Sequence, residues 1–283
     1  MSTPSTAVLR LVAEEAARRA GNYAAGAFRS AMTVDLKRDR YDIVTEHDRN
    51  AEDLIVPMIL DRVPDSVVVG EERGRRGDGT AVTWYVDPID GTTNFAQGLA
   101  LWCVSIGAEV DGEIVAGAIY DPMAGHMFSA DDDGAYLEGA PLQAPPAQPG
   151  DRSSIVCGFP GPQDLQAEGP GALEDFAELL TAFSSFRKLG SAAQQLVHVA
   201  AGWADAALLL GGKPWDYAAG KLIAERAGAT YQPFWYPTGG PSDELDSATA
   251  GAHLAPGTIV LGPGADYPVL HEVVERIVAR RQG

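Results

Sequence analysis

The chain of 283 residues is long enough for one large domain or for two packed subdomains that share a continuous core. Hydrophobic residues make up 46% of it and the mean hydropathy is -0.07, which excludes a disordered protein. The 39 acidic and 21 basic residues give a formal net charge of -18, which predicts no binding to nucleic acid or to an anionic membrane. An anionic substrate would therefore need a local positive site.

Cysteine usage and the amino terminus predict a cytoplasmic protein. Cys103 and Cys157 lie far apart in apolar stretches, which favours buried reduced thiols over a disulfide or a nucleophile. The first 20 residues mix charges into their apolar positions, unlike a signal peptide. The chain has no run of about 18 apolar residues, so we expect no membrane span.

The first half of the chain predicts two helices followed by a β-rich segment. Apolar residues recur at helical spacing near the start, and β-branched runs end at glycines and turn pairs further on. In order, we expect helices over 5–29 and 48–61, a strand over 66–70, a surface loop over 72–80, and mostly strands over 82–136 with a hairpin turn at Asp111-Gly112.

The run PLQAPPAQPG, residues 141–150, is the strongest break in the chain and predicts a subdomain boundary. We expect residues 1–145 to form an α+β subdomain with most of the candidate metal ligands, and residues 146–283 an α/β subdomain with Asp216 and the substrate side, in one continuous catalytic unit. The second half predicts a strand over 153–157, a loop over 158–171, helices over 172–184 and from the Ser191 cap, a strand over 206–210, a helix over 216–227, strands over 230–235 and 258–261, and a helix over 266–281. The class indicated is α+β or layered α/β.

Carboxylates cluster at the ends of four apolar segments. The clusters are DIVTEHD at 42–48, GEE at 70–72, WYVDPIDGTTNF at 84–95 and WD at 215–216. Each cluster alone fits ordinary turn and cap residues, which Asp-Pro and Asp-Gly pairs often are. Four clusters in one chain favour a shared cation site, and all-oxygen ligands favour a hard ion such as Mg²⁺ over zinc.

The stretch WYVDPIDGTTNF has the spacing of a compact ligand patch. Pro88 fixes its φ angle and Gly91 permits a tight turn, so Asp87, Asp90 and the Ile89 carbonyl can face one point. If the following threonines open a helix, its first N–H groups would bind an anion beside the cation.

These residues resemble the signatures of the inositol monophosphatase family, which are magnesium-dependent, lithium-sensitive phosphatases. WYVDPIDGTTNF is similar to the first signature, PWDYAAGKLIAERAG to the second, and GEE and DIVTEHD to two shorter elements. Order and spacing agree from about residue 5 to 235. The resemblance implies an αβαβα sandwich of the inositol monophosphatase and fructose-1,6-bisphosphatase type, usually a homodimer.

The resemblance also implies a role for each site residue. The metal ligands would be Glu71, Asp87, the Ile89 carbonyl, Asp90 and Asp216, holding two to three Mg²⁺ ions. The catalytic residues would be Thr92, Asp48 and Glu71, with Thr92 and Asp48 acting on the attacking water. Phosphate and substrate would contact Gly91, Thr92, Thr93, Ala192, Asp90 and Asp216. Lys37 and Asp42 would belong to a mobile lid.

Three features depart from the family pattern and bear on the substrate. Leu209 stands where many inositol-type members have a glutamate that binds substrate hydroxyls. Arg226-Ala227-Gly228-Ala229 replaces a Glu-Ala-Gly-Gly element. The segment over 234–255 is longer and more aromatic than usual, and its Trp235 and Tyr236 could line a substrate mouth or simply pack.

The function predicted is a Mg²⁺-dependent phosphomonoesterase that hydrolyses a small polyol, inositol or sugar phosphate with a metal-activated water. The alternatives within the superfamily are phosphatases of 3′-phosphonucleotides, histidinol phosphate or fructose 1,6-bisphosphate. A non-catalytic regulatory binding protein with the same fold is the alternative from another class.

Overall fold

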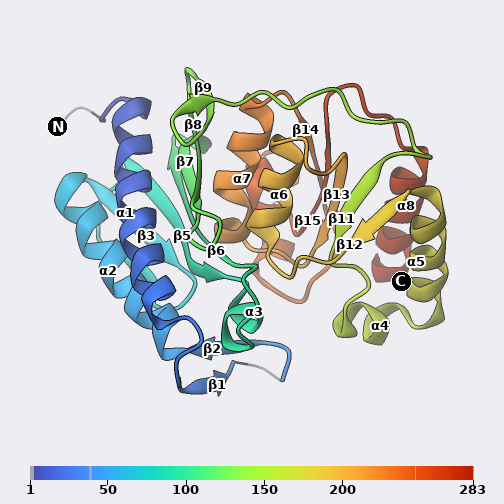
Figure 1. The fold of residues 1–283 in the computed structure, drawn as a ribbon, viewed down its shortest axis with the longest axis horizontal. Coiled ribbons are helices and arrows are strands. Elements are labelled where there is room, and N and C mark those ends of the chain that lie inside the picture. The colour runs from blue at the N-terminus through green and yellow to red at the C-terminus, as the bar shows by residue number, and fades with distance from the viewer. Residues whose placement is uncertain (1–2, 38–39, 246, 283) are drawn as a thin grey trace.

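The computed structural model describes residues 3–37, 40–245 and 247–282 (Figure 1). The helices are α1 Thr6–Ala27, α2 Glu46–Arg62, α3 Thr92–Ala96, α4 Pro162–Glu168, α5 Pro170–Ala182, α6 Ala192–Ala200, α7 Pro214–Arg226 and α8 Pro268–Gln282, with short 3₁₀ turns η1 Pro241–Glu244 and η2 Ala252–Leu254. The strands are β1 Val34–Leu36, β2 Ile43–Thr45, β3 Ser66–Gly70, β4 Gly74–Arg76, β5 Val82–Asp90, β6 Cys103–Val110, β7 Glu113–Asp121, β8 His126–Asp131, β9 Gly134–Leu137, β10 Ala140–Pro141, β11 Ser154–Cys157, β12 Ser185–Arg187, β13 Ala206–Leu210, β14 Thr230–Phe234 and β15 Gly257–Leu261.

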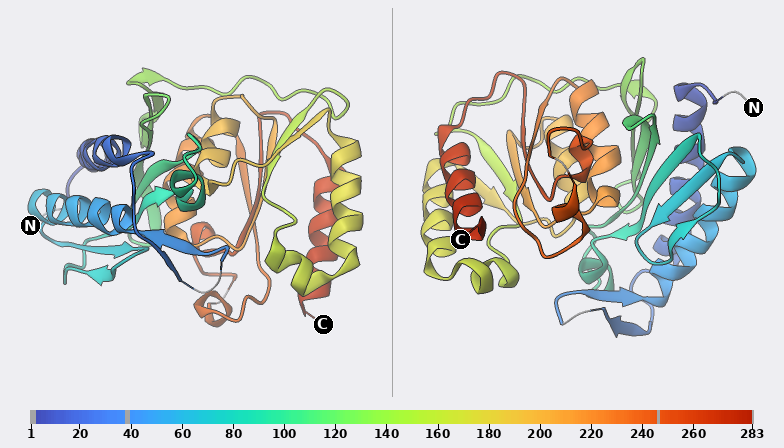
Figure 2. Two further views of the ribbon diagram at one scale, coloured as in Figure 1. Left: turned by 60° about the horizontal axis from the view of Figure 1, so that its bottom comes forward. Right: turned by 180° about the vertical axis from the view of Figure 1, so that it is seen from behind.

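Helices and sheets alternate in layers, which confirms the predicted αβαβα arrangement (Figures 1 and 2). Helices α1 and α2 cover one face of the large sheet, and their apolar sides form one core with it. Helices α6 and α7 lie between the two sheets, in a second core. Helices α4, α5 and α8 cover the outer face of the smaller sheet. The two larger sheets thus have helices on both faces.

The order of strands brings two acidic stretches to one edge. The eight-stranded sheet has the order β10-β9-β8-β7-β6-β5-β3-β4, and the five-stranded sheet has the order β12-β11-β13-β15-β14. In the large sheet β3 and β5 are parallel neighbours, with Gly70 opposite Val86. The next residues along the two strands, Glu71 just after β3 and Asp87 within β5, therefore lie side by side.

Helix α7 packs closely on the large sheet and brings its own acidic residue to the same edge. Glycines in β6 and β7 make this approach possible, because a Cβ built on Gly107 would lie 2.7 Å from the Ala218 Cβ, and one on Gly117 would lie 2.9 Å from the Ala219 Cα. The first turn of α7 carries Asp216.

The two loop predictions were partly wrong. Strand β4 lies within the predicted loop over 72–80 and pairs with β3 along the sheet edge. Helix α4 lies within the predicted loop over 158–171, because Pro162 fits the first helical position and Asp164 caps the N–H of Gly161 at 2.6 Å. The short strands β1, β2 and β12 were not predicted. The other predicted helices and strands are present, with ends that differ by a few residues.

The run over 141–150 connects the two sheets. The α6 and α7 core draws residues from both sides of it, and the division into two subdomains stays a prediction. Cys103 and Cys157 are buried free thiols, as expected. In the part of the chain that the structure describes, the helices are too short or too polar to cross a membrane.

Replacing Gly107 by Ala should lower the free energy of unfolding by about 1–3 kcal/mol, because overpacking forces the sheet and α7 apart. Gly26 in α1 provides the control, since a Cβ there meets nothing within 4 Å. Gly26→Ala should stabilise the protein by about 0.4–1 kcal/mol. Urea denaturation of both variants measures these changes, and equal stabilities would contradict the close contact of β6 with α7.

Candidate metal and phosphate site

Three carboxylates converge where β5 ends and α7 begins. Asp87, Asp90 and Asp216 each offer an oxygen, and these oxygens all lie within 4.8 Å of one another. Asp87 and Asp90 are buried, with 2% and 7% of their surfaces exposed. The structure therefore brings together three of the predicted ligands from segments more than a hundred residues apart.

The backbone of the Asp-Pro-Ile-Asp-Gly turn fixes these carboxylates. The pairing of β5 with β6 shifts register between Asp87 and Asp90, so the chain bulges there. The Ile89 N–H donates to Asp87 Oδ1 at 3.0 Å. Gly91 has a φ of 100°, and a Cβ on it would lie 2.9 Å from the Leu101 carbonyl oxygen. Only glycine fits this position without strain.

Asp90 is held by the start of helix α6. Its Oδ2 accepts hydrogen bonds from the Ser191 hydroxyl at 2.5 Å and from the Ala193 N–H at 2.6 Å. Its Oδ1 accepts one from the Ala192 N–H at 3.1 Å. Ser191 also caps α6, as predicted, by accepting the Gln194 N–H at 3.2 Å. The support of Asp90 by α6 was not predicted.

Asp216 is the third residue of α7 and caps that helix. Its Oδ2 accepts the Lys213 N–H at 2.6 Å, which leaves the other carboxylate oxygen available to the cluster. Pro214 at the start of the helix needs no N–H partner.

The cluster has an excess of negative charge that burial makes costly. Burial raises the pKa of Asp87 well above its usual value, and the charges of Glu71 and Asp90 raise it further. Burial, Asp90 and Glu71 likewise raise the pKa of Asp216 well above normal. Burial also raises the pKa of Asp90 to about 6, although the bonds from Ser191 and Ala193 oppose this. A divalent cation among these oxygens would remove the repulsion, so the residues fit a hard metal ion.

Glu71 lies beside the three aspartates, and its carboxylate contacts Lys37 of the predicted lid. Lys37 Nζ, just after β1, contacts Glu71 Oε1 at 2.7 Å and Glu72 Oε1 at 2.6 Å. The Lys37 N–H donates to the Asp42 carbonyl at 2.8 Å, so both lid residues belong to the β1–β2 hairpin. Burial raises the pKa of Glu71, and Lys37 opposes that shift. The hairpin thus supplies a cation at the edge of the site.

Glu52 of α2 is a supporting residue that sequence reasoning missed. It is fully buried, and its carboxylate accepts the N–H groups of Glu72 at 2.8 Å and Arg73 at 2.9 Å. A Cβ on Gly70 would lie 2.5 Å from the Glu52 Cδ, so the glycine leaves room for this carboxylate. The spacing of Glu52 in its helix carries no signal for this contact.

Thr92 and Asp48 are linked as the resemblance implied. The Thr92 hydroxyl lies 2.8 Å from Asp48 Oδ1 and 3.0 Å from the Ile89 carbonyl oxygen, and it can donate to either. Asp48 is fully buried, and its Oδ2 accepts the Thr45 N–H at 2.8 Å and the Thr45 hydroxyl at 2.5 Å. Burial raises the pKa of Asp48, although the bonds from Thr45 and Thr92 oppose the shift.

A cavity of about 260 Å³ opens beside the carboxylates. Asp90, Asp216 and Ala192 line it on the side of the site, and Leu209 lines its wall. The Ala192 N–H donates to Asp90, so it is not free for a ligand in this structure. Gly91 precedes the first residue of α3, and Thr93 is exposed in the first turn.

Asp87→Asn should make the metal-free protein more stable than the wild type at about pH 7. Asn keeps an oxygen for the Ile89 N–H while removing a buried charge. Because the fold raises the pKa of Asp87, the wild type loses stability relative to the variant as pH rises above about 4. Chemical denaturation from about pH 4 to about pH 8 measures the difference.

Mg²⁺ should raise the melting temperature of the wild type and have a smaller effect on Asp87→Asn. Asp65→Asn is the matched control, since Asp65 accepts one backbone N–H, from Thr80 at 2.8 Å, between α2 and β3. If metal-free Asp87→Asn is no more stable than the wild type at any of these pH values, repulsion among the carboxylates does not destabilise the fold.

Comparisons with known proteins show the family to which the sequence is similar. Residues 6–262 match the profile described as the inositol monophosphatase family. The Nus factor SuhB of Vibrio cholerae is 36% identical over 230 residues, which cover 79% of this chain and 84% of that protein. The inositol-1-monophosphatase of Synechocystis is 35% identical over 219 residues, covering 77% and 76%.

Among solved structures, the extragenic suppressor protein suhB of Bartonella henselae superposes with a TM-score of 0.78 at 26% identity and covers 97% of this chain and 99% of that one. The shared fold is the layered one found here, and the matched range of the family profile spans the positions of the predicted site residues. The chain belongs to the inositol monophosphatase family.

Proposed function

We propose that the protein is a Mg²⁺-dependent phosphomonoesterase of small polyol, inositol or sugar phosphates. The observation that carries the proposal is the cluster of buried Asp87 and Asp90 with the partly buried Asp216, next to the linked pair Thr92 and Asp48. The family match supports it, as does the relative named inositol-1-monophosphatase.

The metal ligands in this proposal are the three clustered aspartates, with Glu71 and the Ile89 carbonyl beside them. When bound, Mg²⁺ would neutralise phosphate charge and lower the pKa of a water molecule. The occupancy, two to three ions, follows the family resemblance. When Glu71 binds a metal ion, its carboxylate would release Lys37.

The chain's own residues would position the water and the phosphate. Asp48, with a raised pKa, is suited to take the hydroxyl proton of Thr92 across their 2.8 Å contact. The Thr92 oxygen would then accept a proton from the attacking water. The N–H groups of Gly91, Thr92 and Thr93 lie at the start of α3, where first-turn donors have no partners within the helix. They would bind the phosphate oxygens.

The cavity wall favours alcohols other than myo-inositol. Leu209 offers no acceptor where a glutamate would bind hydroxyls, and Phe159 adds a second apolar side chain. The polar lining residues Gln163 and Gln195 remain for hydroxyl contacts. Histidinol phosphate, fructose 1,6-bisphosphate and 3′-phosphonucleotides therefore stay in the substrate panel.

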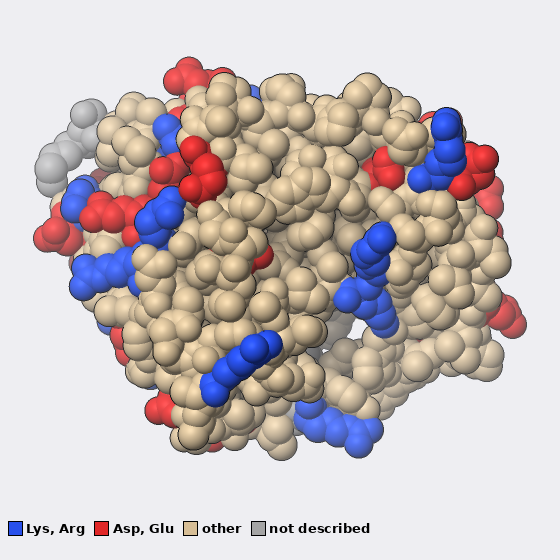
Figure 3. Space-filling view, in the orientation of Figure 1, with Lys and Arg blue, Asp and Glu red and all other residues tan. Residues whose placement is uncertain are grey.

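A binding role is the second candidate, because the relatives named Nus factor SuhB carry a name that is not an enzyme's. Direct contact of this chain with nucleic acid is disfavoured by its net charge of -18. Lys and Arg side chains are scattered over the face in Figure 3 and form no continuous patch there. Lithium sensitivity, a homodimer and a cytoplasmic location stay predictions.

Phosphate release from about a dozen phosphate esters, with Mg²⁺, with a chelator and with Li⁺, tests the proposal. Mg²⁺ should support turnover, and the chelator should abolish it. Asp90→Asn should remove release as well, but Asp216→Asn is the cleaner variant because Asn can still accept the Lys213 N–H.

Asp216→Asn should lower kcat by at least about 100-fold, since it removes one charge from the cluster. Asp65→Asn makes the same chemical change away from the site and should keep wild-type rates. Substantial Mg²⁺-dependent turnover by Asp216→Asn would refute the site assignment. Lack of release from every ester by the wild type would favour the binding role.

A further inference from the structure

A second groove continues from the catalytic cavity. It has a volume of about 490 Å³ and shares five lining residues with the first cavity. The shared residues are Gln163, Asp164, Leu210, Gly211 and Gly212. The first cavity, at about 260 Å³, is smaller than the typical range of about 300–1,000 Å³ for small-molecule sites. A substrate larger than a phosphate with a short alcohol would therefore extend into the groove.

The outer lip of the groove comes from the start of the segment over 234–255. Tyr236, Pro237 and Thr238 line the groove. The Tyr236 hydroxyl accepts the Gly211 N–H at 2.6 Å and donates to the Pro256 carbonyl at 3.1 Å, so this lip is tied to the start of the catalytic cavity. Tyr236 thus lines the groove as well as packing against its neighbours.

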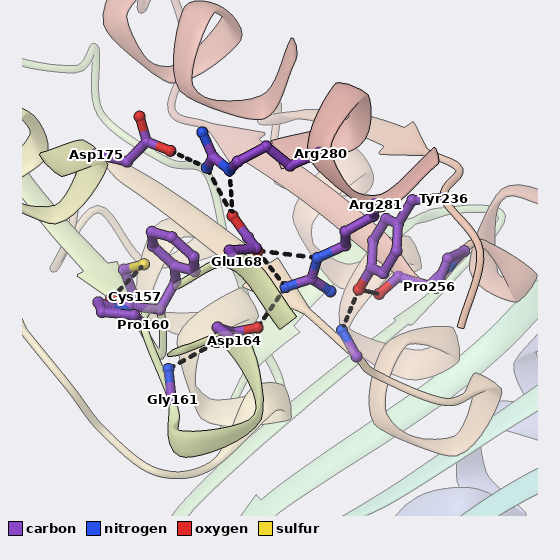
Figure 4. A network of polar contacts seen from close by, with 12 residues as sticks. Cys157, Pro160, Gly161, Asp164, Glu168, Asp175, Tyr236, Pro256, Arg280 and Arg281 are labelled. Atoms are coloured by element: carbon purple, nitrogen blue, oxygen red, sulfur yellow. Dashed lines mark hydrogen bonds and ion pairs between the residues drawn. The ribbon is translucent and has the colours of Figure 1, made fainter. Parts of the chain in front are cut away.

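Helices α4 and α8 hold the opposite wall through ion pairs (Figure 4). Arg281 contacts Asp164 at 2.5 Å and Glu168 at 2.6 Å, and its guanidinium lies 4.6 Å from the centre of the Tyr236 ring. Arg280 also pairs with Glu168, at 2.6 Å. These arginines are neutralised by buried carboxylates, so they shape the groove rather than attract a ligand.

Lys213 differs from these arginines in its ion pairing. It is exposed, lines the groove, and among the described residues no carboxylate forms an ion pair with it. A Cβ built on Gly240 would lie 3.9 Å from Lys213 Nζ, so the ammonium group reaches the lip of the groove. Lys213 also stands three residues before Asp216, at the junction of groove and cavity. In a chain with a net charge of -18, this ammonium group is a local positive charge at the groove.

We propose that the groove is a subsite for a second phosphate group, bound by Lys213 while the first phosphate occupies the metal site. This inference rests on the proposed function and narrows its substrate to a small sugar or polyol bisphosphate. A lysine suits this role because its ammonium binds phosphate as a point charge. The single carboxylate among the described lining residues, Asp164, is already paired with Arg281 and does not oppose the ligand.

The test compares fructose 1,6-bisphosphate with fructose 1-phosphate, two esters of one sugar. The measured quantity is the ratio of their kcat/KM values, in wild type and in Lys213→Gln. The wild type should prefer the bisphosphate, and Lys213→Gln should lower the ratio about tenfold, the effect of one lost charged contact. Added salt should weaken the wild-type preference. Arg19→Gln, at an exposed position of α1, makes the same change in net charge and should leave the ratio unchanged.

Calorimetric binding of both esters, with Ca²⁺ in place of Mg²⁺, separates this subsite from the proposed activity. Binding of the bisphosphate that depends on Lys213, in a protein that hydrolyses no ester, would refute the proposed function and keep the subsite. Turnover with a ratio that changes less than about twofold in Lys213→Gln would overturn the subsite and keep the function. A wild type that binds both esters equally, or an Arg19→Gln protein that loses the preference as well, would also overturn the subsite.

Discussion

The repulsion between buried carboxylates is the constraint on which the site depends. Asp87, Asp90 and Asp216 are held within 4.8 Å of one another by elements that face a continuous core. Each carboxylate is fixed by backbone or hydroxyl donors, so the three side chains cannot rotate apart without losing these hydrogen bonds. The fold therefore retains, in the absence of a cation, an arrangement whose electrostatic energy a cation would lower.

The layers of the fold explain how such a cluster is maintained. Parallel pairing of β3 with β5 sets Glu71 beside Asp87, and the close approach of α7 to β6 places Asp216 opposite them. The start of α6 neutralises part of the charge on Asp90 with N–H groups instead of a side-chain cation. Lys37 offsets the charge of Glu71 from the β1–β2 hairpin. Backbone donors thus support Asp90, and a side-chain cation supports Glu71.

Most of the fold could be predicted from the sequence, because long helices and strands repeat their apolar residues over many positions. Three-residue strands such as β1 and β12 are too short to show an alternation of apolar and polar residues. The glycines and prolines around α4 are typical of a loop, so that helix was not predicted. At the site, the signatures contain the three aspartates that the structure brings together, and the resemblance linked Thr92 with Asp48. The support from Glu52 and from the Ala193 N–H depends on contacts between segments distant in sequence, so no local pattern could predict it. The same holds for Lys213, whose place in the groove is visible only in three dimensions.

Anomalous diffraction from crystals that contain Mn²⁺ is the most direct test of the central claim, that the aspartate cluster is a cation site. Mn²⁺ takes the same oxygen ligands as Mg²⁺ and scatters anomalously. The account predicts an anomalous peak at bonding distance from carboxylate oxygens of Asp87, Asp90 and Asp216. Lys37 should no longer contact Glu71. Crystals in which these aspartates carry no Mn²⁺, or in which the ion binds elsewhere with the cluster unchanged, would contradict it.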